Sequence, residues 1–206
     1  VVQDIKALGG QAQAFQADVT HSEQVTELFR GVDEAFGGVD VLVNNAGILE
    51  TFAIADAEPE AVRRTFEANV FSLYYCSREA VKRMSTDHGG KGGVIINLSS
   101  AAARLCNMPG GNAYSASKAA VNAFNLSLAH EVAAQGIRVN AVSPGLIATD
   151  IQNGRGGIDV AAELAKTAVP LRRIGEPEEI AEAVIWLASP AAAYVHGAIL
   201  DVSGGR

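Results

Sequence analysis

Two side chains that could move a proton lie four positions apart in the segment NAYSASKAAVNAF, at residues 112–124. On a helix, Tyr114 and Lys118 share one face and lie one turn apart. A phenol has an ordinary pKa of about 10, which makes it a poor acid–base catalyst at neutral pH. A nearby ammonium favours the phenolate and lowers that pKa, so the pair suits acid–base chemistry. Polar pairs at this spacing also occur on helix surfaces, and both interpretations stay open at this point.

Two further polar residues fit the same chemistry. Ser100 follows the apolar run GGVIINL, where its hydroxyl could hold a carbonyl or alcohol oxygen beside the phenol. Its alternative role is to bond the local backbone at the end of a strand. Asn69 shares a helical stripe with Phe66 and Leu73, and a buried amide needs hydrogen-bond partners. We expect Asn69 either to bridge to a neighbouring helix or to anchor a water in a proton path.

Short motifs rich in small residues follow other apolar runs. NNAG, at residues 44–47, lets the backbone approach a ligand closely, or forms an ordinary turn. PGLIAT, at 144–149, ends a strand with proline, and Thr149 could hydrogen-bond a carboxamide. Asp18 follows an apolar stretch and could accept a hydrogen bond from an adenine amine; alternatively, it accompanies Thr20 at the start of a helix.

Strands alternate with helices along the chain, and these elements must position the polar residues. Strands are expected at 13–18, 39–47, 92–100, 137–145 and 197–205. Helices are expected at 59–85, at 112–136 and from Pro177, with a capping box at Thr20–Glu23 and a loop with short helical pieces at 148–176. The strand at 39–47 should be buried on both faces, as in parallel sheets. The pattern predicts a doubly wound parallel α/β sheet, which binds ligands at the carboxyl ends of its strands.

Composition narrows the function classes. The chain has 206 residues, of which 49% are apolar and 19% charged, and its formal net charge is −7. It has no basic stripe for nucleic acid and no run of 18 apolar residues for a membrane span, so neither partner is expected. The four histidines lack the spacing of a metal site, and no metal is expected. Cys76 and Cys106 are expected to be packing thiols in a reduced, cytoplasmic setting.

Taken in order, these motifs resemble the short-chain dehydrogenase/reductase superfamily in its classical subgroup. They are NNAG after a buried strand, asparagine in the next helix, a serine ending the following strand, YxxxK, and then PG and IxT. The resemblance covers the whole chain, and it extends to bacterial members of the glucose-1-dehydrogenase and 3-oxoacyl-acyl-carrier-protein reductase types. It implies a Rossmann fold, with residues 1–206 forming one NAD(P)-binding domain that is incomplete at its N-terminus.

The resemblance also implies a catalytic tetrad and a site for NAD or NADP. Tyr114 would be the acid–base group, and Ser100 would orient the substrate oxygen. Lys118 would bind the nicotinamide ribose and tune Tyr114, while Asn69 would hold a proton-relay water. Further cofactor contacts are implied at Asp18 and Val19 for the adenine, at Asn45, Ala46 and Gly47 for the adenosine ribose, and at Pro144, Gly145, Ile147 and Thr149 for the nicotinamide.

Three departures from the family pattern stand out. The opening β-α-β unit, with the glycine-rich loop for the pyrophosphate and the residue that distinguishes NAD from NADP, is missing from the sequence, which predicts weak dinucleotide binding. Many relatives have one residue fewer between the serine and the tyrosine, so an insertion within CNMPGG at 106–111 could reshape the substrate mouth. His196 stands where a threonine is common, a change that we expect to be tolerated.

The sequence therefore predicts an NAD(P)(H)-dependent oxidoreductase that passes hydride between nicotinamide and a secondary alcohol or carbonyl compound. The alternative is a catalytically silent dinucleotide-binding or scaffold protein of the same fold. Helices 59–85 and 112–136 are apolar beyond one stripe, which favours a homodimer or homotetramer. Around the substrate mouth, Glu50, Asp56 and Arg104 are the charges in largely uncharged segments, and this favours a small neutral substrate.

Overall fold

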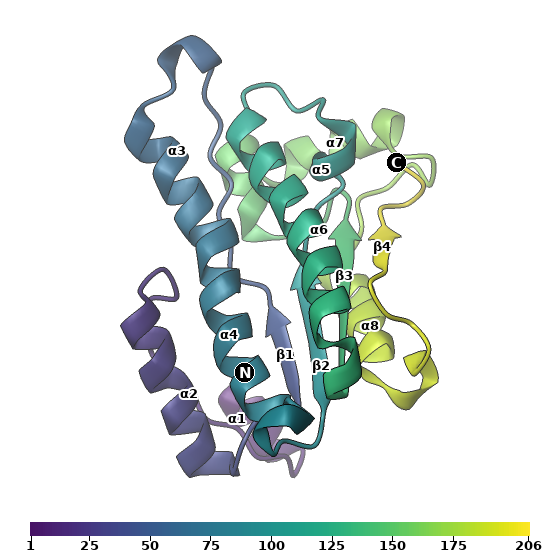
Figure 1. The fold of residues 1–206 in the computed structure, drawn as a ribbon. Coiled ribbons are helices and arrows are strands. Elements are labelled where there is room, and N and C mark those ends of the chain that lie inside the picture. The colour runs from purple at the N-terminus through teal and green to yellow at the C-terminus, as the bar shows by residue number, and fades with distance from the viewer.

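A four-stranded parallel sheet forms the centre of the molecule, with helices on both of its faces (Figure 1). The computed structural model describes all of residues 1–206. The strands lie side by side in the order β1 (Val41–Asn44), β2 (Gly93–Leu98), β3 (Ile137–Pro144) and β4 (Ile199–Val202). Val41 pairs with Val94, Ile95 with Val139, and Ala141 with Ile199. The predicted parallel α/β sheet is confirmed, and its strands all end at one edge.

Helices fill the connections between the strands, as parallel pairing requires. The α-helices are α1 (Val2–Ala7), α2 (Ser22–Phe36), α3 (Pro59–Phe66), α4 (Ser72–Met84), α5 (Ala102–Leu105), α6 (Asn112–Val132), α7 (Ile158–Ala168) and α8 (Pro177–Ala188). A π-helical turn, η2 (Glu67–Phe71), joins α3 to α4, so the long helix expected at 59–85 runs through with a bulge in its middle. None of the helices combines the length and the apolar character needed to cross a bilayer.

Short 3-10 turns complete the connections. They are η1 (Ile54–Asp56), η3 (Thr86–His88), η4 (Ala133–Gln135), η5 (Asp150–Arg155) and η6 (Pro190–Ala192). Gly136, with φ of 76°, ends the last turn beyond α6, as its position predicts. The segment 148–176 contains more helix than expected, because α7 alone has 11 residues.

The sheet buries a different apolar layer on each face. On one face, α2, α4 and α6 pack against β2 and β3, with Phe29, Met84 and Ile95 in the cluster. On the other face, Ile96 of β2 packs with Leu187 of α8. Because successive residues of a strand point to opposite faces, an uninterrupted apolar run such as β2 serves both layers.

Two expectations about the N-terminal side of the sheet are wrong. Residues 13–18 form no strand, because no neighbouring strand pairs with their backbone. β1 is an edge strand with one open face, and Val41 and Val43 are 42% and 41% exposed. The apolar run at 39–47 is therefore covered on one side only, whereas the full burial predicted for it applies to β2.

Two further predictions are wrong: the capping box at Thr20–Glu23 and the burial of one of the two thiols. Helix α2 starts at Ser22 without a side-chain cap. The Thr20 hydroxyl donates instead to Asp18 Oδ1, at 2.7 Å, in the turn that precedes the helix. Cys76 is buried as expected, and burial raises the pKa of its thiol to about 11, but Cys106 is exposed.

A chain of hydrogen-bonded asparagines ties the sheet to α6. Asn44 Nδ2 donates to Asn97 Oδ1 at 2.9 Å, and Asn97 Nδ2 donates to Asn125 Oδ1 at 3.1 Å. Asn125 Nδ2 in turn donates to the carbonyl of Ala198 at 3.2 Å. Asn97 and Asn125 are 0% exposed, so neither can exchange its protein partners for water. These bonds hold β1, β2, α6 and the segment before β4 in one register beneath the carboxyl edge.

We expect Asn97→Ala to lower the free energy of unfolding by about 1 to 3 kcal/mol, because it leaves the buried Asn125 side-chain carbonyl without a partner. The Asn44 amide loses one acceptor and keeps its bond to Ser77 Oγ at 3.1 Å. Urea unfolding followed by circular dichroism measures the change. Asn153→Ala is the matched control, since Asn153 is exposed, and it should stay within about 0.5 kcal/mol of wild type. Equal losses in the two variants would contradict this role for Asn97.

Candidate active site

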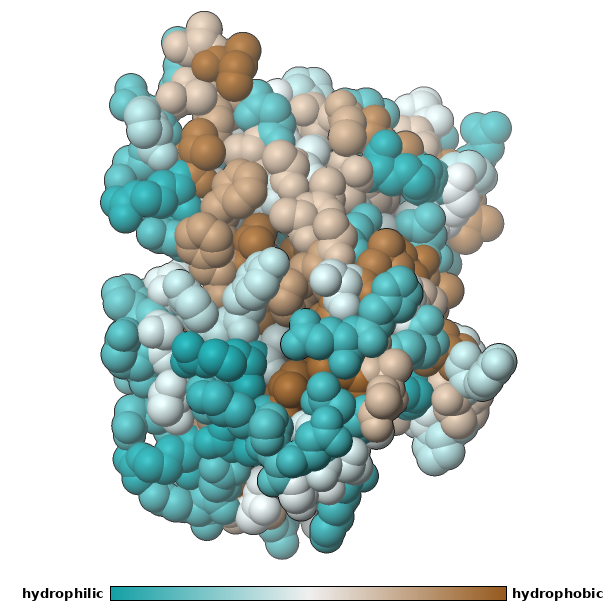
Figure 2. Space-filling view, in the orientation of Figure 1, coloured by the Kyte–Doolittle hydropathy of each residue, from teal (hydrophilic) through white to brown (hydrophobic).

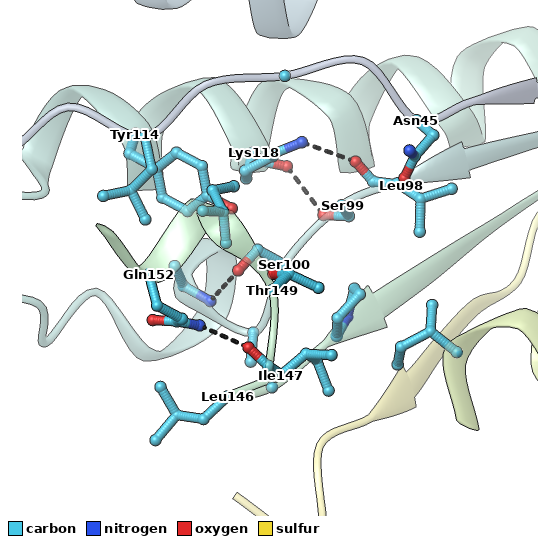
Figure 3. Close-up of a pocket in the computed structure, with 18 of the residues that line it drawn as sticks. Asn45, Leu98, Ser99, Ser100, Tyr114, Lys118, Leu146, Ile147, Thr149 and Gln152 are labelled. Carbon is cyan, nitrogen blue, oxygen red and sulfur yellow. Dashed lines mark hydrogen bonds between the residues drawn. The ribbon is translucent and has the colours of Figure 1, made fainter. Parts of the chain in front are cut away.

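Three of the four side chains expected to carry out chemistry, Ser100, Tyr114 and Lys118, meet in one cavity at the carboxyl ends of the strands (Figure 3). The cavity has a volume of about 970 Å³, and its lining mixes apolar with polar residues. The predicted site residues that line it are Asn45, Gly47, Ser100, Tyr114, Lys118, Pro144, Gly145, Ile147 and Thr149. Its size and mixed lining are those of a small-molecule site.

Four predicted site residues lie outside this cavity. Val19, Ala46 and Asn69 line a separate cavity of about 400 Å³ beside β1. Asp18 lines neither, and its carboxylate accepts hydrogen bonds from the Thr20 hydroxyl and backbone N–H, which lower the pKa of Asp18. The structure thus shows Asp18 in the turn before α2, which is the alternative role for this residue.

Tyr114 and Lys118 lie on the buried face of α6. They are 6% and 5% exposed, so this is no surface pair. Lys118 Nζ donates to the carbonyl of Leu98, at 2.8 Å, where β2 ends. The same strand end holds the helix a second time, because Ser99 Oγ donates to the carbonyl of Lys118 at 3.2 Å. These two bonds fix the Lys118 turn of α6 against the mouth of the sheet.

Burial dominates the electrostatics of both groups. Burial raises the pKa of Tyr114, while the nearby Ser100 hydroxyl and the positive charge of Arg155 act in the opposite direction. Burial lowers the pKa of Lys118 to about 8. The ammonium of Lys118 lies 5.8 Å from the centre of the Tyr114 ring and bonds to Leu98. Arg155 is a cation that lowers the pKa of Tyr114 in this structure, and tuning of Tyr114 by Lys118 stays a prediction.

Asn69 sits in the π-helical turn and clamps two segments together. Its Oδ1 accepts from the N–H of Ile48 at 2.8 Å, and its Nδ2 donates to the Ile48 carbonyl at 3.0 Å. The second Nδ2 hydrogen goes to Ser117 Oγ, at 3.0 Å, on α6. A π turn changes the face on which a helical side chain points, and such turns are frequent at functional sites. The bridging alternative for Asn69 is confirmed, and its amide keeps one lone pair free.

Ser100 and the loop after β3 form the opposite wall of the cavity (Figure 3). Ser100 Oγ accepts from the N–H of Ala102 at 3.1 Å, so it bonds local backbone as well as lining the site beside Tyr114. Gln152 is 4% exposed, and its Nε2 donates to the carbonyl of Ile147 at 3.0 Å. That bond fixes the backbone just before Thr149.

The donor set of the cavity fits the nicotinamide end of a dinucleotide. Lys118 has one protein acceptor, which leaves its other N–H groups for hydroxyls of a ribose. Gly47 lies so close to the clamp that a Cβ there would come within 2.9 Å of Asn69 Oδ1 and 3.5 Å of Lys118 Nζ. Apolar residues such as Ile147 and Leu146 offer flat surface for a ring, and Thr149 adds a hydroxyl at its rim.

Several residues of the site were missed by the sequence reasoning. Ser117 follows Tyr114 by three positions, so helical spacing was a usable signal; its hydroxyl donates to the Tyr114 carbonyl at 2.7 Å. Ser99 is adjacent to Ser100, and alternation along the strand would have turned it inward. Gln152 and Arg155 lie in a segment expected beside the crevice, but an irregular loop gives no period that indicates which side chains enter it.

Comparison with known proteins agrees with this geometry. The family model described as Enoyl-(Acyl carrier protein) reductase matches residues 1–206. A 3alpha-hydroxysteroid dehydrogenase of Mediterraneibacter gnavus is 42% identical over 181 residues, which cover 88% of this chain and 70% of the relative. Among solved structures, a short-chain type dehydrogenase/reductase from Mycobacterium marinum superposes with a TM-score of 0.92 and 34% identity, over 99% of this chain and 79% of that one. A blue fluorescent protein from a metagenomic library, solved in complex with NADPH, superposes with a TM-score of 0.89 and 35% identity, over 99% and 79%.

The lowered pKa of Lys118 makes its contribution to stability depend on pH. Between about 8 and the ordinary value of 10.5, the unfolded chain binds more protons than the folded one, so this group makes stability rise with pH. Below that window the folded protein carries a buried charge. We therefore expect Lys118→Met to gain stability relative to wild type at pH 7, by on the order of 3 kcal/mol less the lost bond to Leu98, and to lose that margin as pH approaches 10.5.

Urea unfolding at pH 7, 8.5 and 10, without added nucleotide, measures the difference between the two proteins. Lys91→Met is the control, because Lys91 is exposed and its substitution should give a difference that is flat with pH. A difference between Lys118→Met and wild type that is flat, or that grows with pH, would contradict the desolvated state of Lys118.

Proposed function

The chain belongs to the short-chain dehydrogenase/reductase family, and from that membership we propose which of its residues carry out the reaction. The protein is an NAD(P)-dependent oxidoreductase that acts on alcohol and carbonyl groups. One observation supports the assignment of Tyr114 as the acid–base group. Tyr114 is a buried phenol whose pKa Ser100 and Arg155 draw down against the effect of burial, in a cavity that also holds the amine of Lys118.

Tyr114 exchanges the proton. In reduction, its hydroxyl donates a proton to the carbonyl oxygen of the substrate, and in oxidation its phenolate takes the proton from the alcohol. Ser100 holds the same oxygen by a hydrogen bond and keeps it beside the phenol. Nicotinamide bound in the cavity supplies the hydride or takes it up.

Lys118 and Asn69 position the acid–base group. Lys118 binds ribose hydroxyls with the donors that Leu98 leaves free, and the charge it carries below pH of about 8 supports proton release from the site. Asn69 holds the loop at Ile48 against α6 and offers its free lone pair to a water of the proton path. Both roles rest on buried, hydrogen-bonded side chains, which hold their geometry when substrate enters.

The remaining contacts of NAD or NADP follow the motifs. In this proposal Pro144, Gly145, Ile147 and Thr149 contact the nicotinamide, and Asn45, Ala46 and Gly47 contact the adenosine ribose. Asp18 and Val19 contact the adenine, which requires that the Asp18 carboxylate serve the turn with one oxygen and the base with the other. The neighbouring structure that holds NADPH supports a phosphorylated dinucleotide as the first one to test.

We place the protein in the cytoplasm as part of the proposal. Cys76 and Cys106 are not paired with each other, and an exposed free thiol such as that of Cys106 persists best in a reducing compartment. The nicotinamide cofactor is available there.

We expect Tyr114→Phe in the full-length protein to lower kcat by about 10²- to 10⁴-fold, because it removes the proton donor and keeps the ring. Steady-state rates with NADPH or NADH and a panel of ketones and secondary alcohols measure the loss. Tyr194→Phe is the control, because Tyr194 is fully exposed and lies outside the cavity, and it should retain wild-type turnover.

The same experiment separates the oxidoreductase from a silent binding protein. Turnover near wild type in Tyr114→Phe would rule out this residue as the acid–base group. Binding of NADPH, seen as a change in its fluorescence, without turnover of any compound on a broad panel would favour the silent alternative.

An apolar patch on the outer face of α4 and α6 supports a homodimer or homotetramer. Figure 2 shows apolar side chains gathered across these two helices. Phe71, Tyr74 and Leu126 are 44%, 50% and 44% exposed, and the Tyr74 ring lies 4.3 Å from that of Phe124. Aromatic residues at the centre of an exposed apolar patch are typical of an interface between subunits.

We expect Tyr74→Glu to shift the protein towards a smaller species, because pairing would bury the new carboxylate against an apolar surface. Light scattering coupled to gel filtration measures the mass. Ile54→Glu is the control, since Ile54 is 76% exposed and lies away from α4 and α6. A wild-type protein that is already monomeric would contradict the proposed oligomer.

A further inference from the structure

Two arginines line the same cavity as Tyr114, and no carboxylate pairs with either of them. Arg155 closes the 3-10 turn η5, and Arg206 follows β4. Both are half-buried, and neither forms an ion pair or donates a side-chain hydrogen bond within the protein. Arginines elsewhere behave differently: Arg64 pairs with Glu50 at 3.1 Å and Arg173 with Glu179 at 2.7 Å.

The two guanidinium groups are close enough to act on each other. Burial lowers the pKa of Arg206, and the positive charge of Arg155 lowers it further. Like charges held together in a partly buried cavity destabilise the protein unless an anion joins them. The backbone of Arg206 is nevertheless fixed there, because its carbonyl accepts from Arg104 Nη2 at 2.7 Å and from Ser203 Oγ at 3.0 Å.

The charge balance of the cavity is positive. Its charged lining side chains are Lys118, Arg155 and Arg206 against that of Asp150, which is exposed and pairs with none of them. Of the three charges on which the expectation of a neutral substrate rested, two are satisfied within the protein, and the third, Asp56, is exposed and does not line the cavity. Glu50 is held by Arg64, and Arg104 lies 3.5 Å from Asp201.

We propose that the substrate is an anionic alcohol or carbonyl compound, whose carboxylate or phosphate binds between Arg155 and Arg206 while its reacting carbon faces Tyr114. This inference rests on the proposed function of the same site. A guanidinium presents two parallel N–H donors that match the oxygens of a carboxylate or phosphate. Because Arg155 also lies near enough to lower the pKa of Tyr114, the anionic group and the reacting carbon belong to one short molecule.

An anion at the two arginines has two possible sources, the substrate and the phosphates of the dinucleotide. The same pair of substitutions separates them. If the substrate supplies the anion, Arg155→Gln raises the KM of acidic substrates and leaves the Kd of NADPH unchanged. If the cofactor supplies it, the Kd of NADPH rises and the KM values of acidic and neutral substrates change together.

The test uses matched compounds with the full-length protein. Four- to six-carbon hydroxy acids and oxo acids are compared with their methyl esters, and sugar phosphates with the unphosphorylated sugars, by steady-state kinetics with NADPH or NADP. We expect kcat/KM of wild type to favour the anionic member of a pair, and Arg155→Gln and Arg206→Gln each to lower it for that member by about 10- to 100-fold. For the neutral member, Arg206→Gln should change kcat/KM by less than about 3-fold. Arg155→Gln also removes the charge that acts on Tyr114, so it should lower kcat/KM for the neutral member too, by a smaller factor than for the anionic one. Arg155→Lys should recover part of the loss because it restores the charge. Arg172→Gln is the control, since Arg172 is exposed and lies outside the cavity.

Each other outcome overturns the proposal in a distinct way. Equal use of anionic and neutral compounds by wild type would overturn it and leave the oxidoreductase function standing. An equal loss for both members in Arg155→Gln, with a shifted pH profile, would make Arg155 a group that acts on Tyr114 alone. A raised Kd for NADPH would assign the anion to the cofactor. Turnover of neither class by wild type that is folded by circular dichroism would overturn the proposed function together with this inference.

Discussion

The hydrogen bond from Lys118 Nζ to the carbonyl of Leu98 is the contact on which the rest of the site depends. It joins the catalytic face of α6 to the last residue of β2, and the bond from Ser99 Oγ to the Lys118 carbonyl makes the junction two-sided. An amine on a side chain that is only 5% exposed needs an acceptor of this kind, because little solvent can replace it. With α6 fixed in this way, the position of Tyr114, one turn earlier, follows from helix geometry.

The clamp at Asn69 extends this constraint to a third element. It reaches Ile48 after β1 through both backbone groups and reaches α6 through Ser117, whose hydroxyl bonds in turn to the Tyr114 carbonyl. The loop at the end of β1, the long helix and the catalytic helix thus share one hydrogen-bonded network. Such networks fix a single arrangement when every member is satisfied, and a satisfied network also keeps Tyr114 from shifting when a ligand enters.

The sequence predicted the parts of this site that obey a period. Side chains repeat every two residues along a strand and every 3.6 along a helix, so the sequence alone assigns Ser100, Tyr114 and Lys118 to one edge of the sheet. Pairing was harder to predict, because a strand exists only beside a partner: residues 13–18 have strand-like character and no partner, and β1 has one partner where full burial needs two. Arg155 was out of reach for another reason, since a loop after β3 has no repeat that reveals which of its side chains enters the cavity.

The electrostatic design of the cavity follows from where its cations sit. Burial lowers the pKa of Lys118 to about 8, so near that pH a part of the molecules carries a neutral amine. The Lys118 amine donates to the Leu98 carbonyl. Arg155 is the cation near the phenol that stays charged at neutral pH, because burial does not deprotonate a guanidinium. Holding Arg155 in a loop rather than on the sheet lets it meet a ligand and still influence Tyr114, so that binding of an anion and readiness of the phenol are linked through one side chain. The sign of that link is set by charge. An anion bound to Arg155 screens the guanidinium, so it raises the pKa of Tyr114 towards the value that burial favours and keeps the phenol protonated, which is the form that donates a proton in reduction.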